Sequence, residues 1–434
     1  MKLYKIKNSK DFERICRIFR QREEDFKNEE KVVAEILSDV KAKGDKALVS
    51  YSKKFDFPGY NASCIKLNPE KISLARKKVP KDFITTLKNA IKNITEFHRE
   101  EKKRILPWQK KKNGGFVGQK IIPVERAGVY VPGGGAPLCS TVLMNIIPAK
   151  VAGVEKIILC TPLNSKGEVN PYILAAADIL EIGEIYCLGG AQAIGAMAFG
   201  TETVPNVDKI VGPGNIYVAL AKKMVFGKVG IDSFAGPSEI LVIADGSANP
   251  EFIAADLLSQ AEHDKDASSI LITNSLSLAD KVQKEIKAQK EKLSRRDIID
   301  ASLAGNGMLI VVDDINMAIE LANLKAPEHL ELILRSPSDA LKRIKNAGAV
   351  FLGNWTPEAV GDYWAGPNHV LPTAGTARFS SALGVHDFIK RTNYMSYTTK
   401  LLEKAGSEIV KIAEVERLSA HASSVKIRIS RRKT

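Results

Sequence analysis

Short runs rich in β-branched and aliphatic residues, separated by helical stretches, constrain the fold of this chain more than any other feature. They lie at residues 156–159, 185–188, 209–211, 240–243, 269–272 and 308–311. Strands that alternate with helices in this way predict βαβ units, in which parallel sheets carry helices on both faces. Because the runs extend over about two hundred residues, more than one domain of usual size, we expect an α/β fold with two domains.

The first hundred or so residues show a different pattern. Residues 30–52 and 81–103 place apolar side chains at helical spacing among Lys and Glu, which predicts helices. The pattern changes around residues 112–115, and after Thr392 a further helix is expected before a polar, basic tail. We therefore expect a helical N-terminal region before the α/β domains and a tail after them.

The composition of the 434 residues, 44% hydrophobic and 26% charged, is ordinary for a soluble globular protein. The N-terminus lacks the apolar stretch of a secretory signal, and no apolar run is long enough to cross a bilayer. We expect a cytoplasmic protein with no membrane partner. The cysteines Cys16, Cys64, Cys139, Cys160 and Cys187 form no Cys-x-x-Cys pair, which predicts reduced thiols in structural positions.

The net charge of +14 at pH 7 meets one criterion for a nucleic-acid-binding protein. The basic residues concentrate between residues 102 and 112 and again between 426 and 433. Neither cluster contains the interleaved aromatic residues of a single-strand-binding surface. We interpret both as solvated surface that could also steer an anionic cofactor, and we expect no nucleic-acid partner.

Glycine-containing turns are the candidate ligand-binding loops. Gly-Pro dipeptides at residues 212–213, 236–237 and 366–367 lead directly into polar residues. Because open α/β sheets bind ligands beyond the carboxyl ends of their strands, we expect these turns at that edge. The glycine-rich segments at residues 130–135 and 188–192 match neither the Gly-x-Gly-x-x-Gly fingerprint nor a Walker loop, so the nucleotide signal is weak.

Histidines near other polar residues are candidate metal ligands. Gln260 and His263 lie three residues apart near the end of a helix predicted to begin after Pro250, so they share one face and could bind one metal ion. Because glutamine is an uncommon zinc ligand, a polar helix surface is an equal alternative. Asp362 is either a hard oxygen ligand or part of an Asx turn, and His369 is expected to point into a cleft.

Glu328 and His329 follow Pro327, a residue that suits the first turn of a helix. At a helix N-terminus the dipole would favour the carboxylate and the neutral imidazole. Both forms accept protons near neutral pH, as a catalytic base must. The competing interpretation is a capping glutamate beside an incidental histidine. The residues alone thus indicate an α/β enzyme, with metal and nucleotide dependence open and the substrate undefined.

Taken together, these segments resemble the histidinol dehydrogenase family over essentially the whole chain. The most specific match runs from Ile231-Asp232 through residues 235–239 and 254–259 to Glu262-His263. The resemblance also includes residues 327–329, 361–369 and 416–421. Segments so far apart in a sequence do not agree by chance.

The resemblance implies a zinc site shared between the subunits of an intertwined homodimer. Gln260, His263 and Asp362 would bind zinc, and His421 of the neighbouring subunit would be the fourth protein ligand. Since zinc is redox-inert, it would orient the substrate and would not accept electrons. The residues that would contact substrate are Ser238, Gln260, His263, His329, Asp362, His369, Glu416 and His421.

The implied reaction is the NAD-linked, four-electron oxidation of L-histidinol to L-histidine through bound L-histidinaldehyde, which completes histidine biosynthesis. His329 would remove a proton as each hydride leaves, and Glu328 would activate the water that adds to the aldehyde. Three residues match positions that contact NAD in the family: Tyr130, Gln192 and Asn215. His98 and His386 match no motif, and we assign both to structure.

The resemblance also implies two incomplete Rossmann-like, doubly wound domains, which explains the missing fingerprint. A helical arm (1–25) would precede the first part of the main α/β domain with its helical lead-in (26–129). The NAD-binding domain (130–238) would separate it from the second part of the main domain (239–381), which carries the zinc and base residues. A C-terminal dimerisation tail (382–434) would complete the chain.

Other functions remain open at this point. A zinc hydrolase could use the same ligands with Glu328 as base, although the ligands do not follow the His-Glu-x-x-His pattern. A nucleic-acid-binding protein would show tight, salt-dependent binding without turnover. A related dehydrogenase could act on another alcohol, because the zinc and base residues alone do not require an imidazole.

Overall fold

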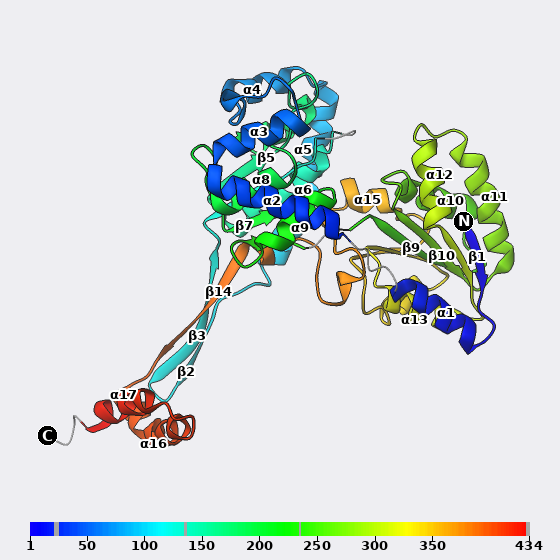
Figure 1. Cartoon of the computed structure of the whole chain (residues 1–434). Coiled ribbons are helices and arrows are strands. Elements are labelled where there is room, and N and C mark those ends of the chain that lie inside the picture. The colour runs from blue at the N-terminus through cyan, green and yellow to red at the C-terminus, as the bar shows by residue number, and fades with distance from the viewer. Residues whose placement is uncertain (21–25, 134–136, 234–235, 431–434) are drawn as a thin grey trace.

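The computed structural model describes residues 1–20, 26–133, 137–233 and 236–430 and arranges them as two α/β units and a projecting arm (Figure 1). The expected α/β fold with parallel sheets is confirmed. Some residues singled out in the sequence lie outside the described ranges: Gly134, Gly135, Ala235, Arg431, Arg432 and Lys433. No helix in the described part of the chain combines the length and apolar character that a bilayer crossing requires.

Within the described residues, the first unit contains a five-stranded parallel sheet. In spatial order its strands are β6 (Ile185–Tyr186), β5 (Lys156–Cys160), β4 (Arg126–Tyr130), β7 (Lys209–Val211) and β8 (Gly230–Ile231). The chain moves outward from β4 to β5 and β6, then returns to the other side of β4 for β7 and β8. The order reverses between β4 and β7, the kind of switch point where open α/β sheets bind ligands.

Helices cover both faces of this sheet. The helices after its strands are α6 (Cys139–Ala152), α7 (Pro171–Ile179), α8 (Gly190–Phe199) and α9 (Ile216–Val225). The expected N-terminal helices are present as α2 (Lys27–Lys43), α3 (Asp45–Phe55), α4 (Pro69–Lys77) and α5 (Lys81–Lys102), with a short turn η1 (Ala62–Cys64). Because α2 packs on α8 and α9, α4 on α7, and α5 on α6, the N-terminal helices complete the core of the first unit.

The second unit contains a six-stranded parallel sheet in its described residues. In spatial order the strands are β1 (Lys2–Lys5), β11 (Met308–Val311), β10 (Ser268–Thr273), β9 (Glu239–Ala244), β12 (His329–Ile333) and β13 (Ala349–Leu352). Its helices are α1 (Ser9–Arg20), α10 (Pro250–Ala261), α11 (Leu276–Lys290), α12 (Arg296–Gly305), α13 (Ile315–Lys325), α14 (Pro337–Leu341) and α15 (Glu358–Tyr363). Every residue of β9 and β10 is buried, as their continuous apolar runs predict for central strands.

The N-terminal segment differs from the helical arm expected over residues 1–25. Residues 2–5 form β1, an edge strand that pairs in parallel with β11. These residues, Lys-Leu-Tyr-Lys, do not show the polar and apolar alternation that marks a strand in the sequence. The helical part of the segment is α1, which packs on α13. Residues 21–25 lie outside the described ranges.

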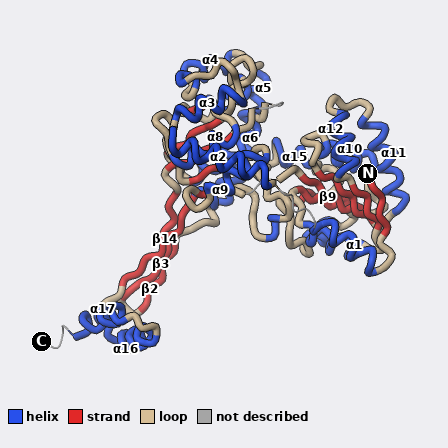
Figure 2. Tube along the Cα trace, in the orientation of Figure 1, coloured by secondary structure: helices blue, strands red, loops and turns tan. Residues whose placement is uncertain are grey.

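The arm is a three-stranded antiparallel sheet that extends away from the first unit (Figures 1 and 2). Its strands in spatial order are β14 (Ile389–Ser396), β3 (Gly115–Pro123) and β2 (Trp108–Lys112), and the turns η2 (Thr376–Arg378) and η3 (Val385–Phe388) precede β14. Helices α16 (Thr399–Val415) and α17 (Ser419–Ser430) pack on each other at its far end. The helix expected after Thr392 begins at Thr399, because β14 continues to Ser396.

Candidate active site

The candidate metal-binding and catalytic residues of the second α/β unit lie where the two units meet. Residues 232–238, described except for 234–235, lead from the carboxyl end of β8 to the amino end of β9. Asn368 donates from Nδ2 to the carbonyl oxygen of Met144 in α6 at 2.6 Å. Asn93 in α5 donates to the carbonyl oxygen of Trp364 at 2.9 Å. These bonds hold the loop after α15 against the first unit, so α15 lies at the junction (Figure 1).

The amino ends of the strands form this edge of the second sheet. Ser238 immediately precedes β9, and His329 opens β12. The Gly212–Pro213 turn follows β7 at a carboxyl end, as expected, but the Gly236–Pro237 turn precedes β9, so the expectation is wrong there. The reason is that this turn lies in the connection from β8 of the first sheet, which enters β9 at its amino end. Helix α10 after β9 runs back toward the amino ends of the strands, so Gln260 in its last turn arrives at the same edge.

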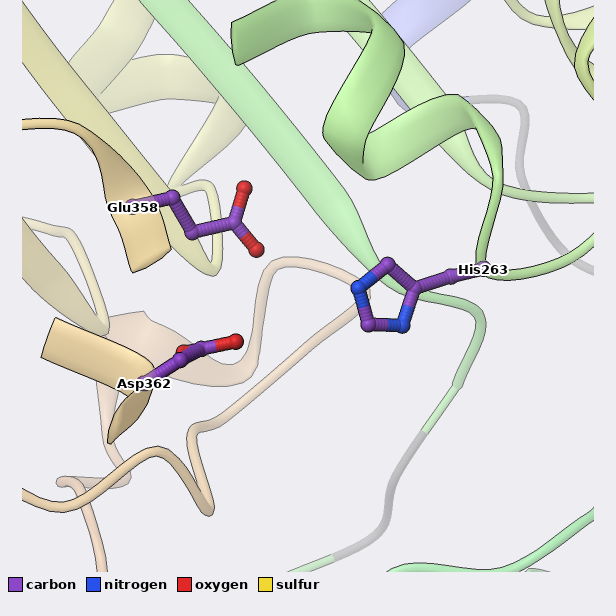
Figure 3. A group of neighbouring side chains, drawn as sticks. All are labelled: His263, Glu358 and Asp362. Carbon is purple, nitrogen blue, oxygen red and sulfur yellow. The ribbon is translucent and has the colours of Figure 1, made fainter. Parts of the chain in front are cut away.

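Three side chains form a candidate metal centre within the described residues. Ligand atoms of His263, Glu358 and Asp362 all lie within 4.8 Å of one another, and the side chains point toward a common space (Figure 3). His263 follows α10, whereas Glu358 and Asp362 belong to α15. The two acids are four residues apart and therefore share one face of their helix. The structure confirms that His263 and Asp362 are neighbours.

Gln260 is completely buried beside this centre. With the amide turned so that it can donate, its nitrogen lies 3.1 Å from both carboxylate oxygens of Glu358 and from Nδ1 of His329. Sequence reasoning paired Gln260 with His263 but overlooked Glu358. The signal that could have revealed it is the spacing of four residues between Glu358 and Asp362. By itself, however, a glutamate after Pro357 has the ordinary appearance of a first-turn residue.

Glu328 and His329 do not lie at a helix N-terminus, so that prediction is wrong. The preceding helix α13 ends at Lys325, and Ala326 adopts a left-handed conformation with φ of 50°. Pro327 therefore follows a helix end, a position as common for proline as the first turn. His329 is the first residue of β12, and the buried run that follows it pairs with β9 and β13.

The ring of His329 is buried and held in one orientation. Its Nδ1 lies 3.1 Å from the carbonyl oxygen of Glu239, and because a carbonyl can only accept, this contact favours the tautomer with the proton on Nδ1. In that tautomer the Gln260 amide donates to Glu358 and not to the ring. Among the described residues Nε2 has no hydrogen-bond partner, and it lies 3.6 Å from Glu358 Oε1 and 3.8 Å from Asp362 Oδ1. Burial lowers the pKa of His329 to about 3, and nearby His263 and His369 reinforce the effect. The neutral ring thus presents an unshared electron pair to the metal centre.

Glu328 is also buried, and its Oε2 accepts the main-chain N–H of Glu239 at 2.8 Å. Burial raises the pKa of Glu328 well above its ordinary value, and the carboxylates of Glu239 and Asp362 act in the same direction. Lys325 opposes this shift and pairs with Glu239 at 2.5 Å. The carboxyl of Glu328 therefore has a fixed position beside His329 and the metal centre.

Buried acids surround the centre. Burial raises the pKa of Asp362 to about 7 and that of Glu358 well above its usual range, with Asp362 and Glu328 adding to the shift of Glu358. Glu331 accepts the N–H of Glu358 at 3.0 Å, and burial together with Asp256 raises its pKa. Crowded carboxylates favour a bound dication, and the mixed oxygen and nitrogen donors suit zinc.

His369 and Ser238 lie at the edge of the same region. His369 is half-buried in the loop that contains Gly366–Pro367, which follows α15 and not the carboxyl end of a strand as expected. Burial lowers the pKa of His369 to about 4, although the backbone of Asp362 opposes the shift. Ser238 is half-buried, and its carbonyl oxygen accepts the N–H of Ser268 at 2.9 Å.

The residues expected to contact NAD lie at the carboxyl edge of the first sheet. Tyr130 ends β4, and its hydroxyl accepts the N–H of Gly190 at 3.1 Å. Gln192 is buried in the first turn of α8. Asn215 follows β7 and caps α9, accepting the N–H of Val218 at 3.2 Å. Tyr130 and Asn215 thus flank the switch point between β4 and β7.

Glu416 and His421 are not near these groups within one chain. Both are exposed, and they lie at the end of α16 and in α17. Helices α16 and α17 are at the far end of the arm, distant from α10 and α15 (Figure 1). A single copy of the chain therefore cannot bring them to the metal centre in this arrangement.

The cysteines fit the structural interpretation. All five have free thiols, and Cys16, Cys160 and Cys187 are buried. Burial raises the pKa of the Cys187 thiol to about 12 and also raises that of Cys160. Such thiols stay protonated and unreactive near neutral pH.

Comparison with known proteins assigns the family. The histidinol dehydrogenase family profile matches residues 19–429. Histidinol dehydrogenase from Clostridium acetobutylicum is 54% identical over 398 residues, and that from Caldanaerobacter subterraneus subsp. tengcongensis is 53% identical. Each alignment covers 92% of both proteins. The crystal structure of the Elizabethkingia anophelis histidinol dehydrogenase superposes with a TM-score of 0.93 at 40% identity, covering 100% of this chain and 99% of that one. The chain therefore belongs to the histidinol dehydrogenase family of NAD-linked oxidoreductases, as its motifs predict.

Proposed function

We propose that this protein oxidises L-histidinol to L-histidine through bound L-histidinaldehyde, with zinc and two molecules of NAD, in the cytoplasm. The observation that carries the proposal is the position of His329, whose buried Nε2 lies 3.6 Å from Glu358 Oε1 and 3.8 Å from Asp362 Oδ1, both in the cluster with His263. A base next to a metal centre suits removal of a proton from a metal-oriented alcohol.

The donors at this site fit zinc. His263 supplies a nitrogen and Asp362 an oxygen, and the carbonyl oxygen of the Gln260 amide is a further donor, with Glu358 holding the amide nitrogen. When bound, zinc would hold the imidazole and amino groups of histidinol and so orient the carbinol carbon. NAD would supply the hydride acceptor. The metal ligands thus serve orientation, while His329 and Glu328 move protons.

His329 would act in both oxidations. In the first, a hydride leaves the carbinol carbon while Nε2 accepts the hydroxyl proton, which yields the aldehyde. In the second, a hydride leaves the hydrated aldehyde while Nε2 again accepts a hydroxyl proton, which yields the carboxylic acid. Each step removes two electrons, so the complete reaction reduces two NAD. The bond from Nδ1 to Glu239 keeps Nε2 free to accept the proton each time.

Glu328 would activate the water that adds to the aldehyde. It accepts the N–H of Glu239 through Oε2 and is held beside His329. Burial raises the pKa of Glu328 and so favours its protonated form. A dication next to Asp362 would favour the carboxylate, which is the form that can take a proton from water.

Tyr130, Gln192 and Asn215 would contact NAD, and Ser238 and His369 would contact substrate. The position of Tyr130 and Asn215 on either side of a switch point supports the first assignment, because nucleotides bind there in open α/β sheets. The two sheets are joined by a short connection, since only residues 232–238 separate β8 of the first sheet from β9 of the second.

The remaining ligands would come from a second copy of the chain. The arm exposes large apolar side chains, with Met395 69%, Ile412 62% and Val415 85% exposed, and such patches favour association. In a homodimer each arm would extend to the other subunit and deliver Glu416 to the substrate and His421 to zinc. The shared active sites of the sequence prediction are thus part of this proposal.

The first test measures NADH formed per L-histidinol consumed by purified protein, before and after removal of zinc with a chelator. We expect two NADH per substrate, loss of activity on chelation and recovery with added zinc. One NADH per substrate would contradict the roles given to Glu328 and the bound aldehyde. No NADH from the zinc-loaded protein would point to another alcohol substrate or to hydrolysis.

A further inference from the structure

A buried ion pair holds the Gly212–Pro213 turn at the switch point of the first sheet. Lys222 of α9 donates from Nζ to the carbonyl oxygen of Gly212 at 3.0 Å. Asp232 accepts the N–H of the same glycine through Oδ2 at 2.8 Å. Lys222 and Asp232 also pair directly, and their side chains are only 2% and 3% exposed. One ion pair thus occupies both main-chain polar groups of Gly212.

Gly212 packs against the end of β4. Its φ is +117°, and a Cβ atom there would collide with the carbonyl oxygen of Tyr130, so only glycine fits. The hydroxyl of Tyr130 accepts the N–H of Gly190, two residues before Gln192. Asn215 follows Gly212 by three residues. Contacts and stretches of two or three residues therefore link Gly212 to all three proposed NAD-contacting residues.

Asp232 extends these contacts toward the second unit. Its N–H donates to the carbonyl oxygen of Ile210 in β7 at 3.2 Å, and it begins the segment that enters β9. Farther along that segment, the N–H of Gly236 donates to Thr373 Oγ1 at 2.5 Å. Asp232 thus contacts the NAD-side turn and also begins the connection between the two sheets.

We propose that Lys222 and Asp232 are a positioning pair, which fixes the Gly212 turn in the conformation that binds NAD. The inference rests on the proposed NAD-binding site at the carboxyl edge of the first sheet. A buried ion pair contributes little net stability compared with apolar residues of the same volume. Its hydrogen bonds are directional, however, and they fix the orientation of a peptide unit that apolar packing would leave free.

The test compares the double variant Lys222→Met/Asp232→Asn with the wild type as zinc-loaded holoenzymes. Removing both charges avoids a lone buried charge, and an asparagine is close in shape to the aspartate that it replaces. We expect KM for NAD to rise about tenfold, with kcat and KM for histidinol changed less than about twofold. Binding of NADH, followed by its fluorescence, should weaken to the same extent, and the zinc content should stay unchanged.

The matched control is Lys223→Met. Lys223 is the next residue of α9, but it is exposed and pairs with Glu30 on the surface at 3.3 Å. Its substitution should leave every parameter at the wild-type value. If the double variant instead loses zinc, kcat and thermal stability together while its KM for NAD stays constant, the pair is structural and the positioning role is wrong.

The variant Asn215→Ala distinguishes failure of the positioning role from failure of the proposed NAD-binding site itself. A higher KM for NAD in Asn215→Ala, together with a normal KM for NAD in the double variant, would overturn the positioning role and leave the proposed NAD-binding site standing. A normal KM in Asn215→Ala as well would overturn both assignments. A higher KM in both proteins supports the positioning role.

Discussion

His329 Nδ1 lies 3.1 Å from the main-chain carbonyl oxygen of Glu239, the first residue of the neighbouring strand. Because β12 pairs in parallel with β9, with His329 beside Ile240, the register of the sheet brings this carbonyl to the ring. Because a carbonyl can only accept, this contact favours a protonated Nδ1 and therefore an unprotonated Nε2 in the neutral ring. The pairing that builds the second sheet thus also favours one tautomer of the proposed base.

This relationship predicts the behaviour of His329→Ala. Without the ring, oxidation of both histidinol and histidinaldehyde should slow by about 10²–10⁴-fold, the usual contribution of a general base. The zinc content should stay at the wild-type value, because the residue lies beside the cluster of ligands and outside it. Steady-state NADH formation with each substrate and elemental analysis would check both expectations. Loss of zinc in the variant would contradict the assigned role.

A second prediction concerns Glu358, which contacts Gln260 and the metal centre. Glu358→Gln removes one negative charge and the acceptor that orients the Gln260 amide. Zinc affinity should fall by about 10–100-fold, as is typical when a supporting group of a metal site is changed. Competition with a chromophoric chelator measures this affinity. Glu262→Gln is the control, since Glu262 adjoins His263 but is not part of the cluster; equal affinities in the two variants would refute the prediction.

A third prediction concerns the shared site. A mixture of His329→Ala and His421→Ala subunits should recover activity that neither variant has alone. In a mixed dimer one site lacks both groups, whereas the other receives His329 from one subunit and His421 from the other. With random mixing, about half of the dimers are mixed and about one quarter of wild-type activity should return. If each subunit used its own His421, no activity would return on mixing.

A fourth prediction concerns pH. Glu101 accepts from His386 Nδ1 at 2.9 Å and from His98 Nδ1 at 2.9 Å, and it lies at the base of the arm. The bond to Glu101 raises the pKa of His386, with Asp387 contributing and burial and Lys209 opposing. A raised histidine pKa stabilises the folded state below the ordinary value, and this stabilisation is lost as pH rises through the folded value.

The stability difference between wild type and His386→Gln should therefore be larger at about pH 6 than at about pH 8.5. Thermal unfolding of the zinc-loaded proteins across this range measures it. Convergence of the two unfolding temperatures at high pH is expected because the wild-type ring is then neutral as well. A difference that does not vary with pH would assign the effect to packing alone.

The βαβ pattern and the zinc-site candidates could be predicted from local sequence. The runs at residues 240–243 and 269–272 became β9 and β10, because central parallel strands are continuously apolar. The spacing of Gln260 and His263 predicted that both lie near the end of one helix, and α10 indeed ends at Ala261, between them. Such features depend on neighbours along the chain, which the sequence displays directly.

Other features depended on distant parts of the chain. From the sequence alone, Pro327 could precede a helix or follow one. Residues His329–Ile333 form a strand because they are buried within the second sheet. Residues 2–5 became a strand only because they pair with β11. Glu358 joined the metal centre because α15 packs at the junction of the two units, a placement that its local sequence does not indicate.

The sequence by itself determined the family, the alternation of strands and helices, and the residue types available for metal and proton chemistry, since motifs and periodicity are local properties. Only the tertiary structure decided that the candidate metal centre lies at the amino ends of β9 and β12, that the Glu239 carbonyl contacts Nδ1 of His329, and that Glu358 adjoins Gln260. These relationships join residues far apart in the chain, and strand register and helix packing bring such residues together only when the whole core forms.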